Sequence, residues 1–354
     1  MMGAPLDTGR NLDEVILDLA TSALSGGICS SVLVPVRTPS GDHTWSLVTD
    51  PLKLAKAVPV QPVMTVNGAR VLSSFAREGG EVSILAILRP CEARAAVELA
   101  KLEQLDLQHV TMLTFDCPGS VPLKSWRGDR ELLPDRSNPG TLRPLCRQCT
   151  SFTGEGDLCV ADHGGSRLLI PFSDRGGALM KTLGLEASDD ASAWIGWADG
   201  LRAENEAVAE SMRADLMKAY SGLEGLTEMF SGCIGCRSCR TVCPICYCRL
   251  CFIDMKDRRY PASEHLRRSE KAGAARLTSG TLLFHIGRMA HMSLSCVSCG
   301  MCEDACPSDI PIGRMVSLVS GSTTALLGYR AGSDRNGPPP LNTFEKDELH
   351  EFEY

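Results

Sequence analysis

The sequence predicts an α/β N-terminal domain with a parallel βαβ core, followed by a mostly α-helical C-terminal domain organised around cysteines. Residues 81–88 and 109–115 are apolar runs of strand length, and residues 92–103 between them are strong helix formers. Such runs are typical of strands buried on both faces. A strand, helix and strand at this spacing give a parallel pair with a right-handed crossover. The last third of the chain instead repeats one cysteine pattern twice.

Local patterns predict the remaining elements of the first half. Residues 31–37 are rich in β-branched side chains and predict a strand, and residues 43–49 can return beside it after a turn. A helix is expected over residues 67–77, ended by Gly79 and Gly80. Residues 167–172 predict one more short strand.

Composition then changes along the chain and suggests its division. Residues 119–144 are rich in Pro, Gly and charge and predict a long surface loop. Helix is expected over residues 187–229. We therefore divide the chain into an α/β domain (1–186), a helical connector (187–230), a cysteine-rich domain (231–330) and a flexible acidic tail (331–354).

Composition and charge exclude several classes of function. The chain has 354 residues, 44% of them hydrophobic, and a formal net charge of −7. The acidic balance argues against nucleic acid as a main partner, and no stretch reaches the ~18 apolar residues of a membrane span. No signal peptide is expected at the N-terminus. Seventeen cysteines without an export signal favour the reducing cytoplasm, and metal ligation over disulfides.

The repeated pattern is C-x2-C-x2-C-x3-C-P. Three such thiolates in one turn can cap three corners of a 4Fe-4S cube, and the proline directs the fourth elsewhere. This is the spacing of two-cluster bacterial ferredoxins, in which the fourth cysteine ligates the other cluster. We predict two 4Fe-4S clusters, with paired zinc sites as the alternative. Crossed pairing gives the sets Cys233, Cys236, Cys239, Cys306 and Cys296, Cys299, Cys302, Cys243; if the runs fold separately, each keeps its own four.

Three further thiols, Cys246, Cys248 and Cys251, extend the first run. They form either an alternative ligand set or further metal site, or a cysteine-rich wall that tunes the cluster, and we expect the wall. His285 and His291 flank an amphipathic stretch at residues 282–292, and we expect them to pack rather than ligate.

Four cysteines of the first half form a further candidate site. Cys91 and Cys117 each follow a predicted parallel strand, so both lie at the carboxyl edge of the sheet, where open α/β folds keep their sites. Cys146 and Cys149 have the two-residue spacing used for metals. The four could converge on a third 4Fe-4S cluster, or each could simply fill space, the reading expected for Cys29 and Cys159.

These residues resemble a known family. Residues 88–95 (LRPCEARA) are similar to the TPC(Q/E)xxA segment of the β-subunits of coenzyme F-420 hydrogenases and formate dehydrogenases. Residues 113–117, 145–152 and 156–160 resemble the segments that follow, and the likeness covers roughly residues 16–185. It implies that Cys91, Cys117, Cys146 and Cys149 hold a third 4Fe-4S cluster and that the domain binds FAD. The family's early Gly-rich segment is altered here, and Ser151 stands where the family has Asp.

The cysteine-rich domain, with its long interval between runs, resembles the α-helical ferredoxin arrangement of heterodisulfide-reductase and succinate-dehydrogenase-type subunits. We therefore predict an iron–sulfur, FAD-containing electron-transfer β-subunit of a multi-subunit cytoplasmic oxidoreductase of the formate dehydrogenase, hydrogenase or heterodisulfide reductase type. Its partners would be catalytic redox subunits and a soluble electron carrier; F-420, NAD(P), ferredoxin or none stay open, as does the direction of flow. The alternatives are a flavin-free relay subunit and a zinc-holding assembly module.

Overall fold

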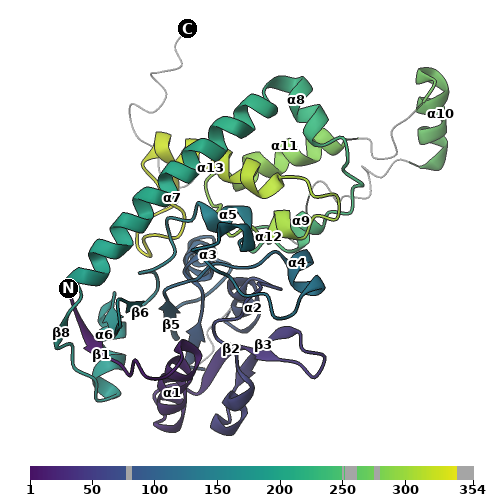
Figure 1. The fold of residues 1–354 in the computed structure, drawn as a ribbon. Coiled ribbons are helices and arrows are strands. Elements are labelled where there is room, and N and C mark those ends of the chain that lie inside the picture. Colours follow the sequence, from purple (N-terminus) through teal and green to yellow (C-terminus); the bar gives the residue numbers. More distant parts are fainter. Residues whose placement is uncertain (77–81, 249–250, 252–260, 275–279, 341–354) are drawn as a thin grey trace.

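The N-terminal half is built on one mixed sheet (Figure 1). The computed structural model describes residues 1–76, 82–248, 251, 261–274 and 280–340. These residues form an eight-stranded sheet of order β3-β2-β4-β5-β6-β7-β1-β8. The strands are β1 (Met2–Pro5), β2 (Ser31–Arg37), β3 (His43–Val48), β4 (Ile84–Ile87), β5 (Val110–Phe115), β6 (Leu158–His163), β7 (Ser166–Pro171) and β8 (Asp189–Asp190).

The centre of the sheet is parallel, as predicted. Strands β2, β4, β5 and β6 pair in parallel, with Ile84 opposite Val110 in the β4–β5 pair. Helix α3 (Pro90–Lys101) connects β4 to β5, so the predicted βαβ unit is confirmed. Antiparallel strands flank this core: β3 on one side, and β7, β1 and β8 on the other.

Both faces of the sheet are covered, which explains the unbroken apolar runs. Ile84 and Ala86 pack with α3 and with α2 (Gly68–Phe75), whose N-cap is Asn67. Leu85 and Ile87 point the other way, toward α1 (Leu12–Ser25) and α6 (Asp174–Thr182). Because successive residues of a strand face opposite sides, a strand buried on both faces is apolar at most of its positions.

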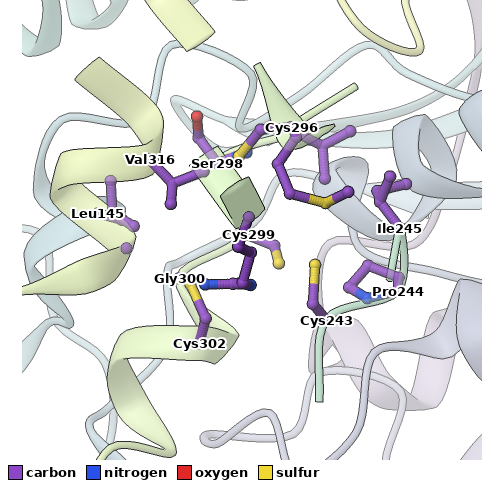
Figure 2. A pocket seen from close by; sticks show the side chains of 14 residues that line it. Leu145, Cys243, Pro244, Ile245, Cys296, Ser298, Cys299, Gly300, Cys302 and Val316 are labelled. Atoms are coloured by element: carbon purple, nitrogen blue, oxygen red, sulfur yellow. The ribbon is translucent and has the colours of Figure 1, made fainter. Parts of the chain in front are cut away.

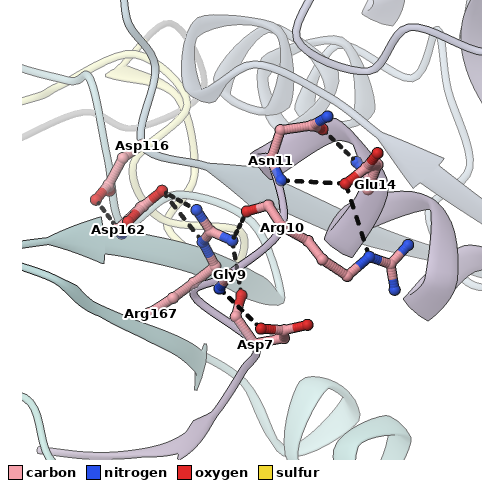
Figure 3. A network of polar contacts seen from close by, with 8 residues as sticks. All are labelled: Asp7, Gly9, Arg10, Asn11, Glu14, Asp116, Asp162 and Arg167. Atoms are coloured by element: carbon pink, nitrogen blue, oxygen red, sulfur yellow. Dashed lines mark hydrogen bonds and ion pairs between the residues drawn. The ribbon is translucent and has the colours of Figure 1, made fainter.

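The N-terminus contributes elements that the sequence analysis did not identify. Strand β1 pairs with β7 and β8, and α1 begins with a capping box between Asn11 and Glu14. The Arg167 guanidinium on β7 donates to the backbone oxygens of Asp7 (2.7 Å) and Arg10 (2.8 Å), as Figure 3 shows. Short strands without an apolar run give little sequence signal, so only pairing reveals them.

Strand β6 was also missed, although a signal existed. It forms a hairpin with β7 through Gly164 and Gly165, which both have positive φ (62° and 80°). Two glycines between β-forming runs are typical of a two-residue hairpin. The expected surface loop over residues 119–144 contains the short helix α4 (Leu123–Gly128), and its Trp126 is buried.

The second half is helical, as predicted, and covers the α2–α3 side of the sheet. Apolar side chains of α11 and α13 share one core with α3, including Phe284 and Val316. Figure 1 shows the long α7 crossing beside this layer. None of the described helices is long and apolar enough to cross a bilayer. The remaining helices are α5 (Pro144–Arg147), α7 (Ser192–Ala219), α8 (Gly222–Met229), α9 (Ser238–Thr241), α10 (Ala262–Ala272), α11 (Thr281–Met292), α12 (Met301–Asp304) and α13 (Ile312–Leu327), with 3-10 turns at Pro51–Lys56 and Pro139–Thr141.

The residues after α13 differ from the flexible tail expected from residue 331 onward. Ala331 is 1% exposed, and its carbonyl oxygen accepts from Arg94 Nε (2.9 Å) and Nη2 (2.7 Å). The Gly332 amide donates to Glu98 Oε2 (3.0 Å). Residues 331–332 are therefore packed on α3; residues 341–354 lie outside the described part of the chain.

Candidate iron–sulfur centres

The two cysteine runs form loops with the same backbone conformation. Gly235 and Ser298 occupy equivalent positions and both have positive φ (69° and 56°), and Arg237 and Gly300 form a second such pair (61° and 77°). A short helix follows each loop, α9 and α12. The left-handed backbone conformation is unfavourable for Ser and Arg. Its occurrence at equivalent positions of both loops therefore indicates a shared constraint.

In both loops a backbone amide donates to the first thiol. Gly235 N lies 3.4 Å from Cys233 Sγ, and Ser298 N lies 3.4 Å from Cys296 Sγ. Amides directed at sulfur stabilise a thiolate, which is the form that ligates a metal.

The fourth cysteine of the first run lies with the second run. Cys243, Cys296, Cys299 and Cys302 line one cavity, with Pro244 and Leu145 among its other walls. Figure 2 shows the labelled side chains arranged around this space. This is the crossed pairing, and we call these four residues the middle set.

The other crossed set is Cys233, Cys236, Cys239 and Cys306, which we call the distal set. Burial raises the pKa of Cys239 to about 11, with Arg288 opposing the shift and the neighbouring thiols of Cys302, Cys306 and Cys233 adding to it, so Cys306 lies near the first run. Cys236 is exposed, and a hydrogen bond from Ser238 lowers its pKa.

The four first-half cysteines also converge. Cys91, Cys117, Cys146 and Cys149 line a single cavity, and we call them the third set. Cys91 lies in the first turn of α3, just after the carboxyl end of β4, and Cys117 follows β5, as expected at this edge of the sheet.

The third set adjoins the middle set. Ser298 and Cys299, from the second cysteine run, line the third cavity as well as the middle one. Leu145, next to Cys146, also lines both cavities. The fold therefore places the three cysteine sets in a row in space, with the middle set between the third and the distal sets.

The donor sets consist of thiols alone, which can hold either a zinc ion or a 4Fe-4S cube. The spacing of the two cysteine runs is that of two-cluster ferredoxins and favours the cube.

Three buried arginines accompany these thiols, and the sequence analysis missed them. Arg89, Arg143 and Arg288 are each only 2–3% exposed. Arg89 Nη1 lies 3.1 Å from Cys117 Sγ and donates to the Gly119 carbonyl (2.7 Å). Burial alone would lower the pKa of Arg288, but the thiols of Cys302 and Cys243 outweigh it and raise that pKa. An arginine in a sequence gives no sign that it will be buried.

The remaining cysteines and histidines have other surroundings. Cys29 and Cys159 are buried, as expected for space-filling residues. Cys246 lines a separate cavity with Cys248 and Cys251, and its Sγ lies 3.6 Å from Met292 Sδ. His285 stacks on Phe230 with ring centroids 3.9 Å apart, and its Nε2 lies 3.4 Å from Cys233 Sγ.

Cys243 and Cys246 are close neighbours. A hydrogen bond between the two thiols lowers the pKa of Cys243 and raises that of Cys246. Only Cys243 of the two lines the middle cavity.

Fold and sites together define an iron–sulfur electron-transfer protein with an α/β domain and a C-terminal dicluster domain. Residues 229–310 match the family model of the 4Fe-4S dicluster domain, which supports 4Fe-4S clusters over zinc.

The likeness extends over most of the chain. The β-subunit of F420-dependent formate dehydrogenase from Methanocaldococcus jannaschii is 25% identical over 300 residues, covering 72% of this chain and 75% of that protein. The β-subunit of F420-dependent formate dehydrogenase 1 from Methanococcus maripaludis is 26% identical over 307 residues, covering 74% and 76%. The resemblance to formate dehydrogenase β-subunits is confirmed. A chain of the F420-reducing [NiFe] hydrogenase complex from Methanosarcina barkeri has a TM-score of 0.42 and 13% identity, covering 63% of this chain and 95% of that one.

Proposed function

We propose that this chain is the β-subunit of a multi-subunit oxidoreductase of the formate dehydrogenase or hydrogenase type, in which it carries electrons through three 4Fe-4S clusters. The third, middle and distal sets supply the ligands. The observation that carries the proposal is the sharing of Leu145, Ser298 and Cys299 between the third and middle cavities. Together with the crossed fourth ligands, it makes the three sets neighbours in a row.

When bound, the clusters would move one electron at a time between a two-electron donor or acceptor and a partner subunit. The protein's part is to hold twelve thiolates and to keep water away from them. Cys299 and Cys302 are partly buried, and this burial raises the pKa of both. Such thiols ionise only when a positive centre compensates, which iron and the buried arginines would supply.

The carrier and the catalytic subunits are proposed from the relatives. Both relatives are named as β-subunits of F420-dependent formate dehydrogenases. By analogy, the partner here is a catalytic redox subunit, and the external carrier is a deazaflavin or nicotinamide. The helical arrangement of the dicluster domain also suits a heterodisulfide-reductase-type partner.

The proposal extends to a bound flavin, and one cavity supports it. A cavity of about 310 Å³ beside the middle set is lined by Tyr247, Phe284 and Met292, among others. Such apolar and aromatic walls suit a planar ring. Without flavin, the chain is a relay between two redox partners. Release of a yellow chromophore on acid precipitation of the purified protein favours flavin, and a colourless supernatant favours the relay.

Iron and acid-labile sulfide per chain, measured on anaerobically purified protein, test the cluster assignment. We expect about twelve of each for three cubes. Cys149→Ser should lower both to about eight. Cys159→Ser is the control, because that thiol is fully buried in the same domain but lines neither cavity. Equal losses in both variants would contradict the third site, and zinc in place of iron would contradict the whole proposal.

A further inference from the structure

One buried arginine lies where the third and middle sets meet. Arg143 lines the third cavity together with Cys299. Its Nη1 lies 3.7 Å from the sulfur of Met301, which belongs to the loop of the middle set, and 3.7 Å from Asp304 Oδ2. Within the described structure its Nε has no hydrogen-bond partner.

A second buried arginine lies between the middle and distal sets. Arg288 on α11 lines the middle cavity. One turn earlier on the same helix, His285 places Nε2 3.4 Å from Cys233 of the distal set. Residues three apart share a helix face, so this face of α11 borders both sets. Neither Nε nor Nη1 of Arg288 has a hydrogen-bond partner among the described residues.

We propose that Arg143 and Arg288 are positioning residues, each of which sets the reduction potentials of the two clusters on either side of it. This inference rests on the proposed function. The N–H groups without partners would donate to cluster or cysteine sulfur on both sides. A guanidinium suits the role because its fork of donors is fixed, planar and always charged.

The physical reason is the charge that accumulates when electrons arrive. Reduction adds a negative charge to a buried centre, and two neighbouring reduced centres repel each other. A buried cation between them stabilises both reduced states, because charges interact strongly where water is excluded. Removing that cation should therefore lower both neighbouring potentials. A purely structural arginine would instead have its donors satisfied by protein acceptors, as those of Arg94 are by Ala331 and Ser151.

The test is a redox titration followed by electron paramagnetic resonance on anaerobic protein. Arg288→Gln should lower the potentials of the middle and distal clusters and leave the third unchanged. Arg143→Gln should lower the third and middle and leave the distal unchanged. We expect at least a tenfold change in the reduced-to-oxidised ratio, which is 59 mV for one electron. Signals are assigned from their loss in Cys149→Ser and Cys236→Ser.

Two further variants separate tuning from structure. Arg288→Lys keeps the positive charge, so the potentials of the middle and distal clusters should stay close to those of the wild type. If Arg288→Gln loses iron, this variant provides the test of charge instead. Arg213→Gln, at an exposed position on α7, should shift nothing. Shifts in a single cluster, equal shifts in all three, or none would overturn the inference. If the wild-type protein holds only eight irons, the third cluster and the proposed role of Arg143 are both overturned. The signals of the middle and distal clusters would still test the proposed role of Arg288.

Discussion

The docking of the segment after α13 can be tested at one glycine. Gly332 has φ +71°, and a Cβ built there would lie 2.1 Å from the carbonyl oxygen of Arg94 on α3. That oxygen is backbone, so no side-chain rotation relieves the overlap. Gly332→Ala should therefore lift the segment from α3 and break the hydrogen bonds to Glu98 and Ala331 described above.

The magnitude follows from these contacts. A non-glycine residue in the left-handed region costs about 1–2 kcal/mol. Loss of the three hydrogen bonds, one from Gly332 N and two from Arg94, costs about 1 kcal/mol each. Loss of the hydrogen bonds alone should lower the free energy of local opening of this segment by about 3 kcal/mol. At 1.36 kcal/mol per factor of ten, the population of the open segment then rises about 100-fold.

Limited trypsin digestion measures that population, since cleavage of a transiently open segment follows its equilibrium when reclosing is fast. Arg330 and Arg335 supply the cleavage sites. Gly328→Ala is the matched control, because Gly328 also has positive φ (+58°) but its Cβ would meet nothing within 4 Å. Cleavage of Gly332→Ala no faster than that of Gly328→Ala would refute the reasoning.

Three further changes have definite expected results. Cys246→Ser should leave the iron content unchanged, since its thiol lines the neighbouring cavity; loss of four irons would make it a ligand. Gly176→Ala should lower the free energy of unfolding by about 3 kcal/mol in thermal denaturation, because the Cβ would lie 2.0 Å from Asp157 O. Gly177→Ala places its Cβ in open space and should raise the free energy of unfolding by up to about 1 kcal/mol. Burial lowers the pKa of His43, so the unfolded chain takes up the proton first and stability should fall as the pH drops below about 7. In His43→Phe, urea titrations should show a smaller fall.

Much of the candidate site could be predicted because ligand chemistry is local. Three thiols within one turn must serve a common centre, whatever surrounds them, and the proline after the fourth directs it away. Position in the βαβ unit likewise placed Cys91 and Cys117 at one edge, because parallel strands end together. The spacing left open whether the fourth ligands cross, and only the tertiary structure brings Cys243 to the cavity lined by Cys296, Cys299 and Cys302, which supports the crossed pairing.

Of the elements that the sequence did not predict, some had a recognisable sequence pattern and others had none. The glycine pair at 164–165 could have revealed β6, since positive φ at two adjacent residues is typical of a hairpin. The edge strand β1 had no such signal, because a four-residue strand is defined by its partners. Likewise, the Pro- and Gly-rich composition after α13 indicated a flexible segment, although its first residues pair with buried polar groups of α3.

The sequence by itself determined the cysteine loops, the parallel core and the helical second half, since each depends on residues close together in the chain. Tertiary structure alone decided which sets are neighbours and which cations lie between them. Arg143 and Arg288 are separated by 145 positions in the chain, and no local pattern marks either one. Their burial beside thiols arises when the second cysteine loop packs against α5 and the α3 side of the sheet, because long-range contacts decide which charges lose their water.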